Sequence, residues 1–161
     1  MAALMTAETL AIRPARPGDQ HAIFDLIREL ARFERLEHVV SGSPDALAHD
    51  LFGERPSAEA LLAESDGVPI GFALFFSTYS TFLTRPGLYL EDLFVLEPYR
   101  GQGVGRALLR AVHERARERG AGRLEWSVLD WNERAIAFYR SFGATVLPDW
   151  RICRIELSPT T

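Results

Sequence analysis

The sequence predicts a single α/β domain over residues 1–161, with a mixed, largely antiparallel central sheet. Apolar residues recur at helical spacing in several segments, and strand-like apolar runs lie between those segments. A strand-like run, a glycine-rich loop and a helical pattern also follow one another over residues 88–118. A chain of 161 residues is long enough to bury one sizeable core.

The first half of the chain predicts one strand, two helices and a hairpin. Residues 1–9 are expected to be flexible, and the run "TLAIRPA" from residue 9 predicts the first strand. The helix after the turn at 17–19 has one apolar face, formed by Ile23, Leu26, Ile27, Leu30 and Phe33. Pro44 at an early helical position predicts a second, shorter helix. Two apolar runs flank the turn Asp66-Gly67 and predict an antiparallel hairpin.

The second half begins with the strand "LYLEDLFVL", residues 88–96, which leads into the glycine loop. A helix follows the loop, and Gly120 is expected to end it. The run "RLEWSVL", residues 123–129, predicts a further strand.

The last part of the chain predicts a helix and two strands. Asn132 is expected to cap a helix that Gly143 terminates. The runs at 144–147 and 150–157 predict the final strands, and the second would pack Cys153 in the core. The whole sheet would then have about seven strands, flanked by about four helices.

Composition and charge exclude several classes of function. A net charge of −4, with the basic residues scattered, gives no footprint for nucleic acid. No apolar run approaches the roughly 20 residues that span a membrane, and the start lacks the basic region of a signal peptide. A lone cysteine cannot form an internal disulfide, which favours the reducing cytoplasm. None of the four histidines has ligand-like spacing, so no metal site is expected.

The glycine loop predicts an anion site. Gly101, Gly103 and Gly105 stand at alternate positions between a strand and a helix. The first N–H groups of a helix have no intrahelical partner, and the helix dipole makes that end electropositive. Glycine also lets the backbone approach a ligand and adopt positive φ.

Several kinds of loop compete for this assignment. A Walker A loop needs a lysine, and the chain has none, so this class is excluded. A dinucleotide fingerprint would need glycine where Arg106 stands. A tight connection without a ligand stays open, although three glycines cost conformational entropy. The remaining pattern is [RQ]-x-x-G-x-[GA], which residues 100–105 match as Arg-Gly-Gln-Gly-Val-Gly.

This loop and its neighbours resemble the GNAT superfamily of acetyl-CoA-dependent N-acetyltransferases, closest to its spermidine/spermine and thialysine (diamine) branch. The resemblance spans about Ile12 to Leu157, and rests on "LIRELARFE", "LYLEDLFV", "YRGQGVG", "VLDWNERAIAFYRSFGA" and "DWR". It implies the GNAT fold, acetyl-CoA as cofactor, a small-molecule amine as substrate, and a homodimer.

The resemblance also implies which residues hold the cofactor. The loop would bind the diphosphate, and N–H groups at the end of the preceding strand would bind the pantetheine arm. The residues carried over to this role are Phe94, Val95, Arg100, Gly101, Gln102, Gly103, Val104, Gly105, Arg106, Asn132, Ala135 and Tyr139.

Acetyl transfer to an amine needs a base for the ammonium and an acid for the departing thiolate. The resemblance makes Tyr139 the acid and Glu91 the base, and both are therefore catalytic candidates. Tyr139 could instead be an aromatic core anchor, and Glu91 could belong to an exposed edge strand. Alternation would place Glu91 on the opposite face of its strand from Asp92, with Tyr89, Leu93 and Val95 beside Glu91, and Leu90 and Phe94 beside Asp92.

The substrate candidates are Glu91, Asp92, Glu34, Phe82 and Trp150. Adjacent acids in an apolar strand are costly to bury alone, and a cationic amine would be a partner for them. Glu34 could also be an ordinary surface charge, and Trp150 could be core packing. The polyamine branch has an acid where Ser80 stands and a tryptophan at position 82, so the loop resembles the thialysine branch more.

These observations predict transfer of an acetyl group to a primary amine of a small molecule, by direct attack in a ternary complex. Alternatives that keep the fold are a protein amine as substrate, another acyl-CoA, or a non-catalytic acetyl-CoA-binding module.

Overall fold

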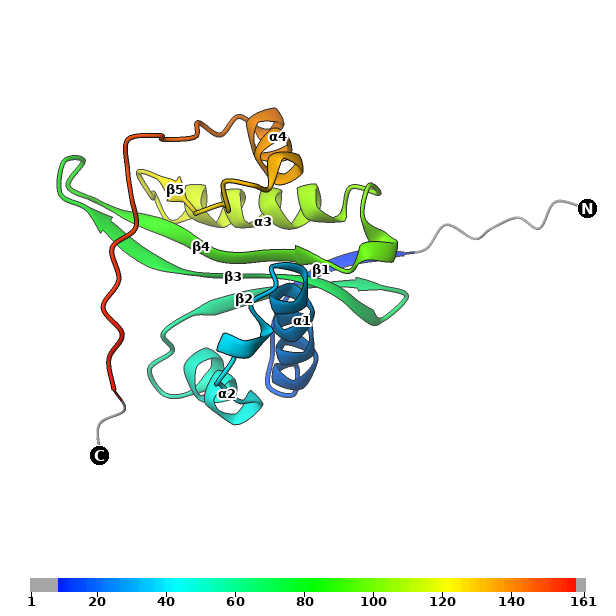
Figure 1. The fold of residues 1–161 in the computed structure, drawn as a ribbon. Helices are drawn as coiled ribbons and strands as arrows, with labels where there is room; N and C mark the ends of the chain where they lie inside the picture. The colour runs from blue at the N-terminus through cyan, green and yellow to red at the C-terminus, as the bar shows by residue number, and fades with distance from the viewer. Residues whose placement is uncertain (1–8, 159–161) are drawn as a thin grey trace, which may run out of the picture. The chain divides into compact units, whose positions relative to one another are not determined.

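The computed structural model describes residues 9–158 of the chain. Its α-helices and strands follow one another in the order β1 (Leu10–Pro14), α1 (Gln20–Phe33), α2 (Pro44–Phe52), β2 (Glu59–Ser65), β3 (Val68–Ser80), β4 (Arg85–Val95), α3 (Val104–Glu118), β5 (Leu124–Glu125) and α4 (Glu133–Phe142) (Figure 1). Short 3₁₀ turns, η1 (Glu37–Val39) and η2 (Glu97–Tyr99), follow α1 and β4. The chain divides into two compact units, Met1–Ser127 and Val128–Thr161, and only the first contains strands of the described sheet.

The sheet of the first unit has five strands in the order β1-β2-β3-β4-β5. Every neighbouring pair is antiparallel except β4 and β5, which are parallel. The predicted hairpin is confirmed as β2 and β3, and both residues of its turn have positive φ, 49° at Asp66 and 80° at Gly67. Such a turn matches the right-handed twist of the strands it joins.

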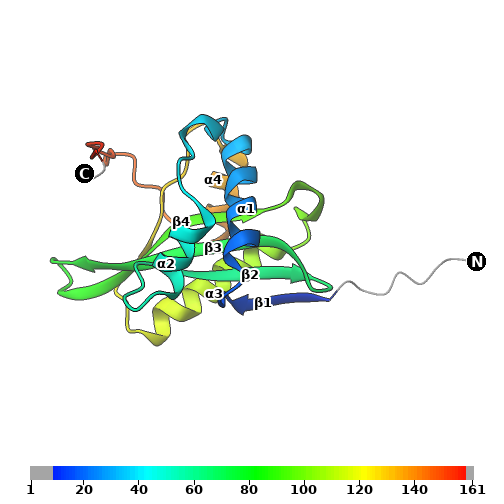
Figure 2. The same cartoon turned by 90° about the horizontal axis from the view of Figure 1, so that it is seen from below.

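Helices cover both faces of this sheet. Figures 1 and 2 show α1 and α2 on one face and α3 on the other. The buried cluster on the first face comprises Ile23, Leu26, Leu51, Ala60, Leu62, Phe72 and Phe94. On the second face, Leu108, Leu109 and Val112 of α3 are fully buried. The apolar face predicted for α1 is confirmed at Ile23 and Leu26, which are buried, whereas Phe33 at the end of the helix is exposed.

The predicted helices are confirmed, and so are both predicted ends of α4. Ser43 precedes α2, and its Oγ accepts a hydrogen bond of 3.1 Å from the N–H of Ala46. Asn132 caps α4 in the same way, because its Oδ1 accepts a hydrogen bond of 3.1 Å from the N–H of Ala135. Gly143 ends α4 with φ of 106°, a left-handed conformation that favours glycine.

The number of strands is the main correction to the sequence prediction. Within residues 9–158 the sheet has five strands rather than about seven, because 144–147 and 150–157 form none and β5 shortens to two residues. An alternating pattern makes a segment able to pair, but a strand forms only beside a partner. Residues 128–158, the described part of the second unit, contain no strand as partner, and Cys153, expected in the core, is exposed there.

A second correction concerns β4, which contains a β-bulge. Asp92 pairs with Leu74, but Leu90 pairs with Phe75, so Glu91 has no register partner in β3. The Leu96 N–H donates to Ile70 of β3, whereas the Leu88 N–H donates to the Arg123 carbonyl beside β5. In a regular strand the N–H groups of two residues eight apart would point to the same side. Here they point to opposite sides, so the bulge reverses the backbone between Leu88 and Leu96.

The bulge changes which side chains share a face. Tyr89 pairs with Phe76, and their ring centroids are 5.3 Å apart. Phe76 lies on the same face of β3 as Leu74, the register partner of Asp92. The prediction that Tyr89 and Asp92 lie on opposite faces was therefore wrong, because the alternation does not continue through Glu91.

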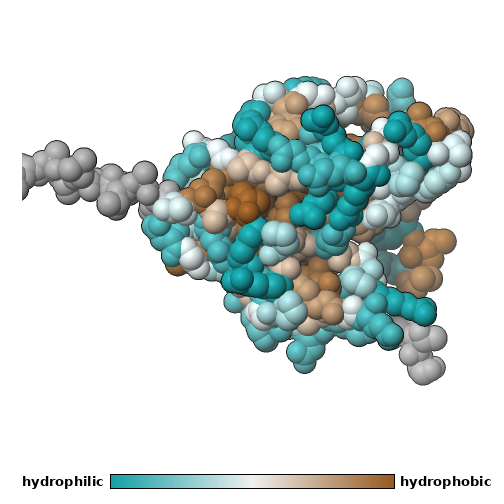
Figure 3. All heavy atoms as spheres, turned by 180° about the vertical axis from the view of Figure 1, so that it is seen from behind, coloured by the Kyte–Doolittle hydropathy of each residue, from teal (hydrophilic) through white to brown (hydrophobic). Residues whose placement is uncertain are grey.

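No helix among the described residues is long and apolar enough to cross a membrane. On the side of the molecule drawn in Figure 3, apolar patches are small and are separated by hydrophilic side chains.

Candidate active site

The glycine loop has the backbone geometry of an anion site. Gly101 and Gly103 have φ of 75° and 85°, in the left-handed region that side chains rarely adopt. Gly103 is the N-cap of α3, and the first hydrogen bond of the helix runs 2.9 Å from the Ala107 N–H to its carbonyl. The N–H groups of Val104 and Gly105 precede that bond and have no intrahelical acceptor. The loop therefore has the free backbone N–H groups of an anion site.

The side chain of Arg100 stabilises this loop through contacts with the end of β4 and with α1. Its Nε donates a hydrogen bond of 2.8 Å to the Val95 carbonyl at the end of β4. Its guanidinium carbon lies 4.7 Å from the ring centroid of Phe33 and 5.3 Å from that of Phe94. One cation thus contacts the last residue of α1 and the end of β4, and sequence analysis had assigned it only to the cofactor.

Gln102 supports the same loop. Its Nε2 donates a hydrogen bond of 3.1 Å to the carbonyl of Pro98. The side chains of Arg100 and Gln102 therefore stabilise the conformation of the loop. Arg106, in the first turn of α3, is half-buried.

At the end of β4, the N–H groups of Phe94 and Val95 point to opposite sides of the strand. Since the Leu96 N–H donates to β3, alternation directs the Phe94 N–H toward β3 as well. The N–H of Val95 then points away from β3, on the side where β5 pairs only with Leu88 and Tyr89. Of the two expected contacts to the pantetheine arm, the Val95 N–H is the better placed.

Carboxyl groups gather beside the bulge. Glu34 is the C-cap of α1 and is half-buried, Asp92 in β4 is half-buried, and Glu91 is exposed. Burial, together with the negative charges of Glu91 and Glu34, raises the pKa of Asp92 to about 7. Burial also raises the pKa of Glu34. An acid that holds its proton this strongly is destabilised as an anion, and a bound cation would relieve that cost.

Phe82 lies apart from these carboxyl groups. It stands between β3 and β4 at the hairpin tip and is 93% exposed. Asp92 is seven residues beyond the start of β4, which corresponds to roughly 20 Å of extended strand. Within one chain, the structure does not bring Phe82 to the acids.

The other candidates belong to the second unit. Asn132 and Ala135 form the cap of α4, and Tyr139 is half-buried on the same helix. The Tyr139 ring lies 5.3 Å from that of Phe138. Helical spacing places Asn132 and Tyr139 on one face of α4. Trp150 follows the helix and is 79% exposed.

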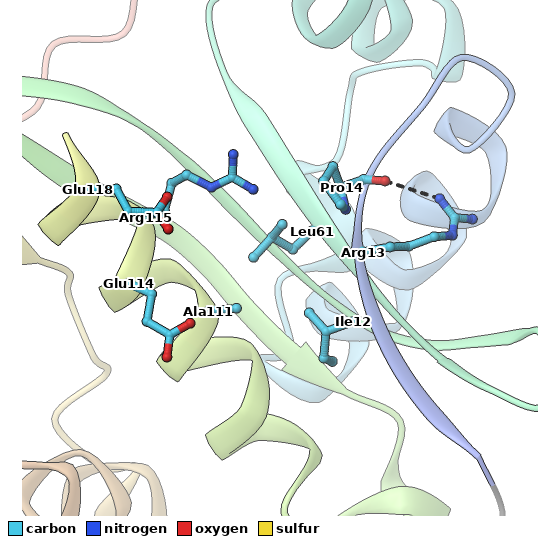
Figure 4. A pocket seen from close by; sticks show the side chains of 8 residues that line it. All are labelled: Ile12, Arg13, Pro14, Leu61, Ala111, Glu114, Arg115 and Glu118. Atoms are coloured by element: carbon cyan, nitrogen blue, oxygen red, sulfur yellow. Dashed lines mark hydrogen bonds between the residues drawn. The ribbon is translucent and has the colours of Figure 1, made fainter.

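A cavity of about 180 Å³ lies between β1, β2 and α3 (Figure 4). Ile12, Leu61 and Ala111 form its apolar part, and Glu114 and Arg115 lie on the helical side. None of the candidate residues lines it, so it is separate from the loop and the carboxyl groups.

Comparison with known proteins identifies the family. Residues 23–144 match the Acetyltransferase (GNAT) family. A thialysine N-epsilon-acetyltransferase of Bos taurus is 40% identical over 156 residues, which cover 90% of this chain and 91% of the relative. An L-ornithine N5-acetyltransferase of Arabidopsis thaliana is 36% identical over 189 residues, which cover 89% of this chain and 83% of the relative.

Solved structures agree on the fold. An aminoglycoside acetyltransferase from an uncultured soil metagenomic sample has a TM-score of 0.78, covers 92% of this chain and 97% of its own, and is 19% identical. This likeness concerns the fold alone. The chain belongs to the GNAT family of acetyltransferases. It is an N-acetyltransferase that uses acetyl-CoA, and the expected family, activity and cofactor are confirmed.

We expect Gly103→Val to weaken coenzyme A binding by at least about tenfold, because a β-branched side chain is strained at φ of 85°. Isothermal titration with coenzyme A measures the effect. Gly18→Ala introduces a side chain at φ of 106° outside the loop, with open space around it, and serves as the matched control. Equal affinity in the Gly103 variant and the wild type would contradict the loop assignment.

Arg100→Gln removes the stacked cation and should raise the KM for acetyl-CoA about tenfold, since the loop loses its brace. The KM for the amine should rise too, because Phe33 adjoins Glu34. Steady-state kinetics with each substrate varied in turn provides both values. Arg110→Gln, at an exposed position on α3, is the control. Unchanged values for both substrates would show that the contacts of Arg100 do not matter for the reaction.

Proposed function

We propose that this enzyme acetylates the terminal primary amine of a small diamine or of a lysine-like amino acid. The observation that carries the proposal is the group of carboxyls at the bulge, with Asp92 half-buried between the charges of Glu34 and Glu91. An ammonium group neutralises such a site. The substrates named by the relatives, thialysine and L-ornithine, carry an amine at the end of a short chain.

In this proposal Glu91 accepts the proton of the ammonium, and Asp92 and Glu34 bind and orient the cation. Acetyl-CoA, when bound, supplies the acetyl group as a thioester. The Val95 N–H and the N–H groups of the loop hold the cofactor, with Asn132 and Ala135 as further contacts from α4. The Tyr139 hydroxyl holds the proton that the departing thiolate needs. The amine attacks directly while both substrates are bound.

Phe82 and Trp150 remain proposed substrate contacts. We also propose a homodimer, in which Phe82 lies at the interface between the two copies. Tyr79, Phe82 and Leu83 expose apolar side chains at the hairpin tip, which supports an interface between copies of the chain. We propose further that residues 1–161 act as one acetyltransferase domain, in the reducing cytoplasm, where Cys153 stays a free thiol.

A panel of amines tests the function. Thiol release from acetyl-CoA is measured with ornithine, lysine, thialysine, putrescine, cadaverine and spermidine. Release that depends on at least one short amine supports the proposal. Release with none of them, while coenzyme A binds, would contradict it and would favour another amine, such as that of a protein.

The ionisation of Asp92 should appear in the pH profile. Below pH about 7 the free enzyme holds Asp92 protonated and neutral, and above it the group is an anion that attracts the substrate. For Asp92→Asn, we expect the ratio of kcat/KM for wild type over variant to rise between about pH 6 and pH 8. Asp25→Asn changes an exposed acid of α1 and is the control. A ratio that is constant over this range would contradict the role of Asp92.

Tyr139→Phe removes one hydroxyl and should lower kcat by about 10²–10⁴-fold, because a positioned acid contributes that much. The affinity for coenzyme A should change little, since the ring is retained. Stopped assays of turnover and titration with coenzyme A separate the two effects. Equal losses in turnover and affinity would mark Tyr139 as structural instead.

A further inference from the structure

Two aromatic rings lie on the face of the sheet that carries Asp92. They belong to Phe76 in β3 and Tyr89 in β4, which are register partners. Their ring centroids are 5.3 Å apart, and the ring planes are inclined by 32°. Both residues are half-buried, so part of each side chain stays accessible. The proposed reaction assigns no role to this aromatic pair.

The strand register places the aromatic pair beside Asp92. Tyr89 pairs with Phe76. Asp92 pairs with Leu74, two residues before Phe76 in β3. Residues two apart in a strand share a face and lie roughly 7 Å from one another. Because the bulge at Glu91 takes up the extra residue of β4, Tyr89 and Asp92 are neighbours on this face.

A hydrogen bond holds the Tyr89 ring from the side opposite Phe76. The Tyr89 hydroxyl and the Ser127 Oγ share this bond, which is 2.8 Å long. Tyr89 pairs with Glu125, the last residue of β5, so Ser127 lies just beyond the last paired position. Both residues belong to the first unit. The ring is therefore fixed before any ligand binds, which lowers the entropic cost of binding against it.

On the other side of Asp92, the same face is filled. The neighbour there is Phe94, which is 6% exposed and belongs to the buried core. The guanidinium carbon of Arg100 lies 5.3 Å from the centroid of its ring. Along β4, a ligand with its ammonium at Asp92 therefore has room toward Tyr89 and none toward Phe94.

We propose that the carbon chain of the amine substrate lies against the aromatic pair, and that Tyr89, held by Ser127, is a specificity-determining residue. It favours substrates with more methylene groups behind the reacting amine, because each methylene that leaves water at the ring adds to binding. This inference rests on the proposed function, since it requires the ammonium to lie at Asp92.

Two series of amines that grow by single methylenes test this assignment. One series is 2,4-diaminobutyrate, ornithine and lysine, and the other is 1,3-diaminopropane, putrescine and cadaverine. The ratio of kcat/KM for wild type over Tyr89→Ala is compared along each series, because the ionisation of the amine in solution cancels in this ratio. We expect a rise of about twofold per methylene, since full burial gives roughly fourfold and one ring covers about half of the group.

Further variants separate the ring from its hydroxyl. Tyr89→Phe keeps the ring, so its ratio should be constant along each series. Tyr89→Leu keeps part of the apolar surface and should give about half the rise, which maintains the test if Tyr89→Ala does not fold. Ser127→Ala frees the ring and should give a smaller rise than Tyr89→Ala. Val68→Ala, at an exposed position beside the β2–β3 turn, is the control and should give a constant ratio.

The outcomes distinguish this inference from the function on which it rests. A ratio for Tyr89→Ala and Tyr89→Leu that is constant along the series that the wild type acetylates would overturn the role of Tyr89 and leave the amine acetyltransferase intact. So would a loss of coenzyme A affinity, measured by isothermal titration, as large as the loss of kcat/KM. A wild type that acetylates no member of either series would overturn the proposed function and this inference with it.

Discussion

The β-bulge at Glu91 is the constraint on which the proposed site depends. Relative to Leu88 and Tyr89, which pair with β5, the extra residue reverses the backbone of β4. Asp92 therefore lies on the α1 face, within electrostatic range of Glu34. The same reversal leaves the Val95 N–H on the side away from β3. In the proposed site, one irregularity thus positions both Asp92 for the amine and the Val95 N–H for the cofactor.

The contacts of Arg100 connect the proposed cofactor loop to the proposed amine site. Its contacts with Val95, Phe33 and Phe94 join the glycine loop to the end of the helix that carries Glu34. Phe94 is itself part of the buried core. The loop is therefore anchored to the buried core of the first unit, although Gly101 and Gly103 are themselves exposed.

The sequence predicted the features that depend only on neighbouring residues. Glycines at 101 and 103 implied positive φ, and Asn132 and Gly143 marked the ends of α4, because each of these effects involves only neighbouring residues. The bulge at Glu91 was not predictable, since it depends on how β3 and β4 register. The strands expected at 144–147 and 150–157 failed for a related reason, because alternation does not supply a partner. The stacking of Arg100 on Phe33 joins residues far apart in the chain, so no local pattern could reveal it.

The burial of Asp92 bears on its proposed role through a simple electrostatic argument. A half-buried acid is costly as an anion, so in the proposed site Asp92 binds a cation strongly and discriminates against neutral ligands. The reacting amine needs this restraint, because its nitrogen must be held at the thioester. In the proposed site the half-buried Asp92 therefore holds the amine, and the exposed Glu91 accepts its proton.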